Sequence, residues 1–156
     1  MKKIISLLMV VIIIISVVAC SPFFTEKRTN SLSEIQSIVR ETQSAFESKD
    51  SQGTQQGISK LIELSKDSMY SELERTVAQF CATYINTGVM LDYIIKNDIK
   101  WLETHDVTRF DVLYSGIFVE VINGGVTHVE TLKGYLRGLV EASQEIFTHY
   151  NELIKK

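Results

Sequence analysis

The sequence predicts an all-α fold, an up-and-down bundle of four to five helices that follows a cleaved signal peptide and a short tether. From residue 31 to residue 156, apolar residues recur at alternating spacings of three and four, which is typical of amphipathic helices. The single proline, Pro22, lies outside this region, as expected because proline disrupts helix interiors. No internal repeat or low-complexity tract interrupts the pattern. We therefore expect one helical domain over residues 31–156.

The first helix is expected to begin at Ser31, because Ser31 and Glu34 have the spacing of a capping box. The polar, glycine-containing segment 50–57 should end it. A shorter amphipathic helix is expected over residues 58–65. The apolar stripe of the first helix consists of Leu32, Ile35, Val39, Thr42 and Phe46, and one side of the second consists of Ile58, Leu61, Ile62 and Ser65.

A long helix is expected from about residue 68 to residue 97. Gly88 in its interior costs about 1 kcal/mol relative to alanine, and it marks either a close helix crossing or a kink. Because the apolar pattern continues on both sides of Gly88, we expect one helix. Trp101, just beyond its end, should close the core rather than form an interface. The apolar stripe consists of Leu73, Val77, Phe80, Tyr84, Thr87, Leu91 and Ile94.

The segment 110–122 fits two structures. Its Val, Ile and Phe content and the Asn123-Gly124 pair after it would suit a β-hairpin. We favour a helix with Thr108 as its N-cap, because a hairpin with no other strands would leave open edges. The helical interpretation places one set of residues on one face, namely Phe110, Leu113, Ile117 and Val121.

The final helix has the clearest pattern. Thr127 and Glu130 form a second potential capping box after the turn at residues 123–125. The apolar repeat of 3.5 residues extends over more than three heptads and is typical of helices that pack at shallow angles. Ser143 is the one polar member of this series. The series consists of Val129, Leu132, Leu136, Leu139, Ser143, Ile146, Tyr150 and Leu153.

The leader that precedes the helical region has the three parts of a secretory signal peptide. Lys2 and Lys3 form a charged start, a mainly apolar segment follows, and residues 17–20, Val-Val-Ala-Cys, end it on small residues. This tetrapeptide resembles the lipobox of bacterial lipoproteins, and the resemblance covers the leader alone. It implies cleavage between Ala19 and Cys20 and a diacylglyceryl thioether on Cys20.

An uncleaved transmembrane anchor is the alternative interpretation of the leader. The apolar segment 4–19 is shorter than the roughly 20 residues that a membrane-spanning helix needs. No basic stop-transfer segment follows it directly, since Ser21 is succeeded by proline and two phenylalanines. These observations favour the lipoprotein interpretation.

The resemblance divides the chain into three parts. Residues 1–19 are expected to form the lipoprotein signal peptide, residues 20–30 the lipidated N-terminus and tether, and residues 31–156 the helical bundle. Ser21 implies sorting to the outer membrane in a Gram-negative cell. In a Gram-positive cell the protein would lie on the outer leaflet of the plasma membrane, so in both cases it would be anchored on the extracytoplasmic side of the envelope.

Charge excludes two classes of partner. Cleavage would remove Lys2 and Lys3, which makes the net charge two units more negative than the −3 of the whole chain. A mildly acidic domain with scattered charges has no basic footprint for nucleic acid. It also has no polybasic patch for anionic lipid, so membrane attachment would depend on the acyl chains.

The sequence nominates no catalytic residue, no metal site and no cofactor. His128 and His149 are three heptads apart, roughly 30 Å along a helix, and cannot share a metal ion within one chain. A solvated position is expected for both, and for His105. Cys81 follows Phe80 in an apolar stretch and should behave as a small buried hydrophobe. No nucleotide-binding or nucleophile-elbow motif is present in the sequence.

The function expected from these features is that of a non-enzymatic envelope lipoprotein that binds another protein. The partner would be a component of a secretion or assembly system, or an incoming phage or conjugation apparatus. The alternative is a carrier that holds a lipid or small hydrophobic ligand between helices. Four glycines could open space for such a ligand, namely Gly88, Gly116, Gly134 and Gly138.

Overall fold

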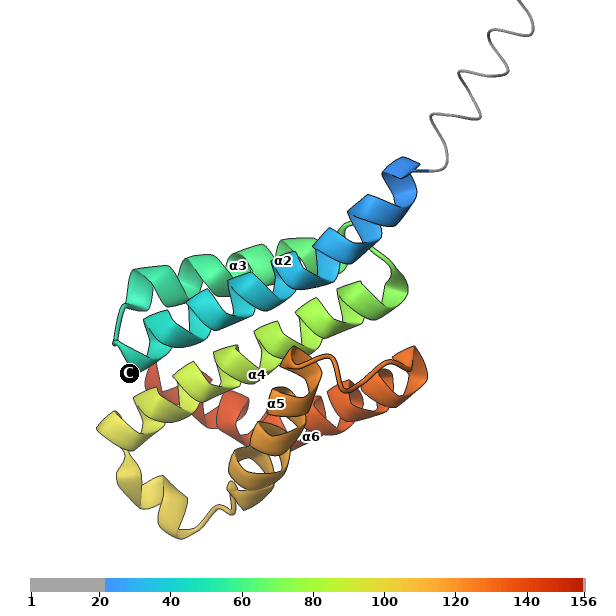
Figure 1. The fold of residues 1–156 in the computed structure, drawn as a ribbon. Helices are drawn as coiled ribbons and strands as arrows, with labels where there is room; N and C mark the ends of the chain where they lie inside the picture. Colours follow the sequence, from blue (N-terminus) through green and yellow to red (C-terminus); the bar gives the residue numbers. More distant parts are fainter. Residues whose placement is uncertain (1–21, 156) are drawn as a thin grey trace, which may run out of the picture. The chain divides into compact units, whose positions relative to one another are not determined.

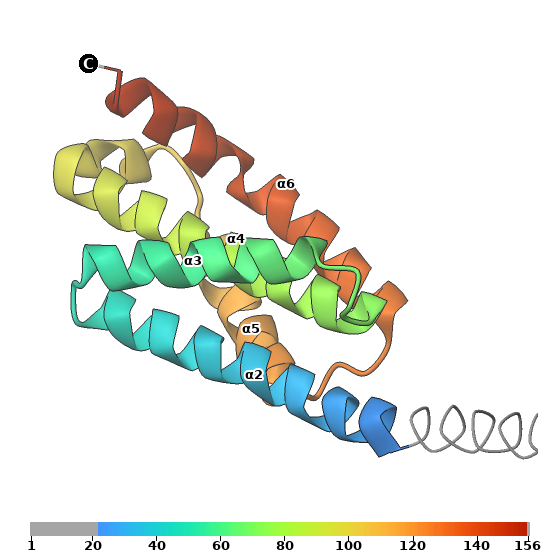
Figure 2. The same ribbon diagram turned by 90° about the horizontal axis from the view of Figure 1, so that it is seen from above.

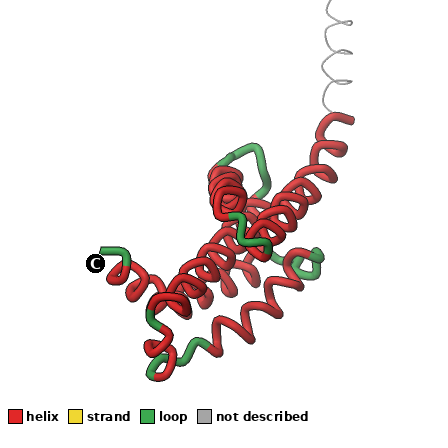
Figure 3. Tube along the Cα trace, turned by 90° about the vertical axis from the view of Figure 1, so that its left-hand side faces the viewer, coloured by secondary structure: helices red, strands yellow, loops and turns green. Residues whose placement is uncertain are grey.

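The computed structural model describes residues 22–155, and side-chain surroundings from residue 32 onward. Every regular element in this range is helical, which confirms the predicted all-α bundle (Figures 1 and 3). The α-helices are α2 (Pro22–Glu47), α3 (Ser51–Lys66), α4 (Glu72–Asn97), α5 (Ser115–Ile122) and α6 (Val129–Leu153). A 3₁₀ helix, η1 (Ile99–Glu103), and a π-helical turn, η2 (Arg109–Tyr114), lie between α4 and α5. The chain forms two compact units, Met1–Glu34 and Ile35–Lys156, and the bundle is the second.

Helix α4 lies at the centre of the bundle. It packs against α3 and against α6, and it also contacts η1 and α5 (Figures 1 and 2). Because it has neighbours on several sides, α4 is buried around much of its circumference rather than along one stripe. Its buried apolar residues are Val77, Ala78, Phe80, Cys81, Ala82, Ile85, Leu91 and Ile94.

Helices α4 and α6 run in the same direction. Side-chain contacts between them rise together along both sequences, because they join Glu72 to Lys133, Thr87 to Ser143, and Asp98 to His149. Two neighbouring parallel helices need a connection that returns the chain from the end of the first to the start of the second. The segment from η1 through η2 and α5 provides it (Figure 1).

Helix α2 starts earlier than predicted. It begins at Pro22, so the expected start at Ser31 is wrong, and residues 22–30 of the predicted tether are helical. The predicted inner face of this helix is confirmed for Ile35, Val39 and Thr42, which are buried.

The predicted break at residues 50–57 is limited to a short turn. Asp50 caps α3 by accepting a hydrogen bond from the Gly53 N–H at 3.0 Å, so the helix includes both glycines of the segment. Gly57 lies directly against α2, where an added Cβ would stand 2.7 Å from the Cβ of Thr42. The glycine therefore allows α3 to approach α2 closely instead of ending the helix.

Helix α4 begins at Glu72, a few residues after the predicted start, and it continues through Gly88 as expected. A capping box that the sequence analysis missed defines this start. The Ser71 Oγ accepts a hydrogen bond from the Glu74 N–H at 3.3 Å, and a Glu74 carboxylate oxygen accepts one from the Ser71 N–H at 2.7 Å. Both bonds satisfy N–H groups that the helix itself leaves without partners.

The segment 110–122 is helical, which confirms the favoured interpretation over the hairpin. Its inner face differs from the predicted one: Leu113 is 50% exposed, whereas Tyr114 and Phe118 are buried. The π-helical turn explains the change, because its i→i+5 hydrogen bonds add a residue to the turn and shift the following residues. The buried series is therefore Phe110, Tyr114, Phe118 and Val121. Thr108 occupies the N-cap position but makes no side-chain capping bond.

Helix α6 has the predicted inner face, since Leu132, Leu139, Ser143 and Ile146 are buried. Its predicted capping box at Thr127 and Glu130 is wrong. The residue at the N-cap position is His128, and its side chain makes no capping hydrogen bond.

The Gly57→Ala variant tests the close approach of α2 and α3. The new methyl group would overlap Thr42, a buried side chain whose Oγ1 already donates to the Ile38 carbonyl at 2.6 Å. We expect a loss of about 1–3 kcal/mol in the free energy of unfolding, measured by chemical denaturation. Gly134→Ala is the matched control, because an added Cβ there meets nothing within 4 Å. It should raise stability by about 0.5–1 kcal/mol, and equal effects of both changes would contradict the packing argument.

Candidate functional site

Two hollows lie on opposite faces of the central helix α4. Successive residues of an α-helix are rotated by about 100°, so the two sets of α4 residues that line the hollows point about half a turn apart. The first set is Gln79, Ala82, Thr83, Asn86, Thr87 and Met90, and the second is Tyr84, Ile85, Gly88, Leu91, Asp92 and Ile95. Neither hollow is evident from the sequence, because both depend on which helices flank α4.

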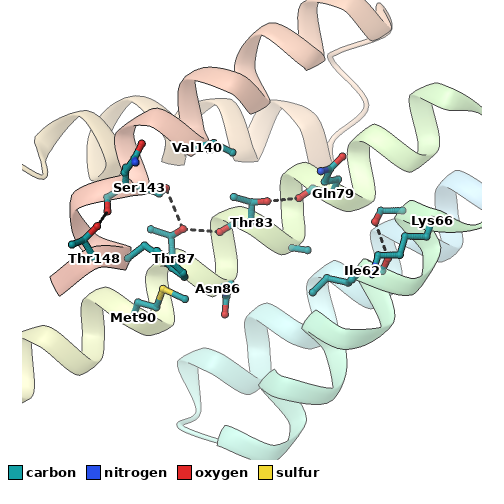
Figure 4. A pocket seen from close by; sticks show the side chains of 14 residues that line it. Ile62, Lys66, Gln79, Thr83, Asn86, Thr87, Met90, Val140, Ser143 and Thr148 are labelled. Atoms are coloured by element: carbon teal, nitrogen blue, oxygen red, sulfur yellow. Dashed lines mark hydrogen bonds between the residues drawn. The ribbon is translucent and has the colours of Figure 1, made fainter. Parts of the chain in front are cut away.

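The first hollow, which we call the α3–α6 groove, has α4 as its floor and α3 and α6 as its walls (Figure 4). Its volume is about 610 Å³. The α3 wall consists of Ile62, Ser65 and Lys66, and the α6 wall consists of Val140, Ser143, Gln144, Phe147 and Thr148. The α4 floor is mainly polar but uncharged, with amide and hydroxyl side chains.

The walls of the α3–α6 groove expose large apolar side chains. Val140 and Phe147 on α6 are 52% and 54% exposed, and Ile62 on α3 is 40% exposed. Lys66 is the one charged residue among the side chains that line the groove, and it forms no ion pair within the described part of the chain. The groove therefore offers apolar contact on both sides and a single positive charge.

A buried polar pair joins the floor of the groove to its α6 wall (Figure 4). The Ser143 Oγ donates to the Leu139 carbonyl at 2.7 Å and lies 3.1 Å from the Thr87 Oγ1. Thr87 can in turn donate its proton to Ser143 or to the Thr83 carbonyl, which is 2.9 Å away. The polar residue in the α6 series is thus fully satisfied, since both hydroxyls have a carbonyl partner in their own helix and also meet each other across the α4–α6 contact.

The second hollow, the α2–α5 cleft, lies on the other face of α4, against the end of α2 and the η2–α5 segment. Its volume is about 510 Å³. Gly88 is the one member of the four predicted space-opening glycines that borders it. Gly116 and Gly134 face open space, and Gly138 makes room for the Tyr114 hydroxyl.

Trp101 is buried, as predicted, at 9% exposure, and two imidazole rings stack on its indole. The ring centroid of His105 lies 4.2 Å from that of Trp101, and the ring centroid of His149 lies 4.9 Å from it, with interplanar angles of 12° and 5°. The His149 Nε2 also lies 3.1 Å from an Asp98 carboxylate oxygen. The expectation that His149 is solvated is therefore wrong, because its side chain is only 14% exposed.

The chemistry available in the described residues is limited. His128 is exposed, and no group of three or more His, Cys, Asp or Glu side chains within residues 22–155 is arranged to hold a metal ion. Cys81 is buried in α4, which confirms its predicted place in the core. Burial in apolar surroundings raises the pKa of the Cys81 thiol far above its usual range, so at neutral pH the thiol stays protonated and unreactive.

The residues of the predicted lipoprotein leader lie outside the described part of the chain. This applies to the signal peptide 1–19, to the cleavage site at Ala19 and Cys20, to the lipidation of Cys20 and to the sorting residue Ser21. Within the described helices, none has the length and apolar character needed to cross a membrane.

Comparison with known proteins assigns this chain to no family. No protein-family model, curated protein or solved structure matches this chain.

The reactivity of Cys81 tests the packing of the central helix. In the Cys20→Ser variant Cys81 is the sole remaining cysteine, and we expect no labelling by an alkylating reagent at pH 8 under native conditions. The same reagent should label the thiol completely in denaturant, as measured by intact-protein mass spectrometry. Rapid native labelling would contradict the burial of this face of α4.

Proposed function

We propose that this protein is a lipid-anchored envelope protein without enzymatic activity, and that it binds an amphipathic helix of a partner protein in the α3–α6 groove. The observation on which the proposal depends is the shape of that groove, which is open, lies between two helices and has exposed apolar side chains on both walls. Helix-in-groove binding uses this arrangement, because an amphipathic helix can bury its apolar face between two such walls.

The dimensions of the groove support a helical occupant. Its floor extends from Gln79 to Met90, which is about three helical turns or roughly 16 Å of α4. A helix laid along this floor would cover Ile62 on one side and Val140 and Phe147 on the other. An amphipathic helix of three turns presents apolar residues at the i, i+3/i+4, i+7 spacing, and these could pack between the two apolar walls.

The charge of the groove restricts the partner further. Lys66 lies near the Gln79 end of the floor (Figure 4). A carboxylate, or the C-terminal end of a helix with its partial negative charge, would be favoured beside this ammonium group. We therefore infer a partner helix that is apolar on one face and acidic near the end that meets Lys66.

The predicted lipoprotein leader supports a location at the membrane surface for this function. A lipid on Cys20 would hold the bundle on the extracytoplasmic side of the membrane and would confine it to two dimensions. Confinement raises its effective concentration near a membrane-bound target, so modest affinity in the groove is sufficient. A component of a secretion or assembly system, or an incoming phage or conjugation apparatus, would present such a target at the envelope.

The Cys20→Ser variant tests the anchor. We expect the variant to fold but to leave the membrane fraction, because its attachment would depend on the thioether-linked lipid. Cys81→Ala is the matched control, since it removes the other cysteine and should stay with the membrane. Membrane retention of Cys20→Ser after a carbonate wash would favour an uncleaved anchor and contradict the proposal.

Photocrosslinking in living cells tests the groove. A benzoylphenylalanine at position 147 replaces a groove phenylalanine, and one at position 99 replaces an isoleucine that is 61% exposed and does not line the groove. We expect one discrete heterologous adduct from position 147 and none from position 99, with the attached partner peptide derived from an amphipathic helix.

Two charge-reversal variants, Lys66→Glu in the groove and Lys60→Glu outside it, provide a matched pair for the same crosslinking experiment. Lys66→Glu should reduce the yield of the adduct about tenfold, because it places a carboxylate where the partner is acidic. Lys60→Glu makes the same change at an exposed position of α3 outside the groove and should have no effect. Equal adducts from positions 147 and 99, an adduct with a second copy of this chain, or no response to Lys66→Glu would overturn the proposal.

A further inference from the structure

The α2–α5 cleft has the size and the lining of a small-molecule site. Its volume of about 510 Å³ falls within the range of typical ligand pockets. Elements distant in the sequence form it, because Phe46 comes from α2, Gly88 from α4 and Val119 from α5. It lies on the face of α4 opposite the α3–α6 groove, so an occupant of one need not displace an occupant of the other.

An aromatic cluster forms one side of the cleft. The ring of Tyr84 stacks on Phe118 at a centroid distance of 4.4 Å and on Phe110 at 5.3 Å. Phe110 and Phe118 are buried, whereas Tyr84 is only half-buried and borders the open space of the cleft. Aromatic faces attract both apolar groups and cations, the latter through the negative potential above the ring.

Gly88 keeps the middle of the cleft open. A Cβ added at Gly88 would meet only two ring atoms of Phe46, each at 3.9 Å, so any larger side chain would extend into free volume. A glycine inside a helix has a cost in stability. Unlike Gly57 and Gly138, which make room for a neighbouring side chain, Gly88 has no packing contact that requires it.

The charged residues of the cleft are mainly acidic. Lys49 is the one basic residue that lines the cleft; its ammonium lies 5.9 Å from the Phe46 ring centroid and is paired with Asp92 at 3.3 Å. Asp92 is also paired with Lys96 at 2.5 Å. Glu47 and Asp111 also line the cleft, and neither forms an ion pair within the described residues. Burial raises the pKa of the Tyr84 hydroxyl, and the negative charge of the Asp111 carboxylate raises it further.

We propose that the α2–α5 cleft binds a small amphiphilic cation, with an alkyl or aromatic body over Gly88 and an ammonium group near Asp111 and Glu47. The apolar body would contact Phe46, Tyr84 and Val119. The cation would gain from two carboxylates that form no ion pair among the described residues and from the Tyr84 ring where it borders the cleft. An anion of the same shape would meet the same carboxylates and be repelled.

Calorimetric titration of the purified full chain in phosphatidylcholine nanodiscs tests this site, with empty nanodiscs as the blank. Three probes share one hexyl body and differ in head group: hexyltrimethylammonium, 1-hexanol and heptanoate. We expect measurable binding of the cation, about tenfold weaker binding of the alcohol and no binding of the anion. Equal binding of all three probes, or a preference for heptanoate, would overturn the proposal.

Variants locate the binding within the cleft. Gly88→Leu fills the open space and should abolish binding of the cation, whereas Gly134→Leu makes the same change in α6 where an added Cβ meets nothing within 4 Å, and should leave binding unchanged. Asp111→Asn should weaken the cation about threefold to tenfold without affecting hexanol. Because Asp111 is exposed, Asp111→Asn should fold normally, so this variant tests the site even if Gly88→Leu fails to fold. Binding that survives both Gly88→Leu and Asp111→Asn would place the cation elsewhere and contradict the site.

Discussion

The packing of α4 between α3 and α6 is the constraint on which the rest of this structure depends. Phe80, Cys81 and Ile94 on this one helix have no exposed surface, and the side chain of Cys81 projects about 100° away from that of Phe80 around the helix axis. A helix buried in this way cannot be stable by itself in water, because its apolar surface extends beyond one stripe. The burial of α4 therefore stabilises the positions of α3 and α6, and their packing in turn stabilises α4.

Small and hydroxyl-bearing residues decide how closely these helices approach. Gly57 brings α3 against Thr42 of α2, and Gly138 makes space on α6 for Tyr114. At the α4–α6 contact, the observed register brings the buried Thr87 and Ser143 hydroxyls together at 3.1 Å. The apolar residues thus provide most of the driving force, and these few positions select one arrangement.

The same central position of α4 explains the two hollows. Its neighbours cover it incompletely, and the strips of α4 left between them form the floors of the α3–α6 groove and the α2–α5 cleft. The two differ in character, because the groove is lined by neutral polar and apolar residues with one lysine, whereas the cleft joins an aromatic cluster to carboxylates. The two proposed binding sites therefore lie on opposite faces of one helix.

Sequence alone determined the features that depend on local spacing and local chemistry. The three-four periodicity predicted the helical class, the buried face of α6 and one part of the buried surface of α4, because a residue's direction from a helix axis follows from its position in the chain. The lipobox resemblance likewise rests on a contiguous segment, Val17–Cys20. Tertiary structure decided what depends on residues far apart: that the glycines of α3 continue a helix, that the π-turn buries Tyr114 and Phe118, that His105 and His149 meet on Trp101, and where α4 is left uncovered. These outcomes require the positions of neighbouring helices, which no local pattern in one chain specifies.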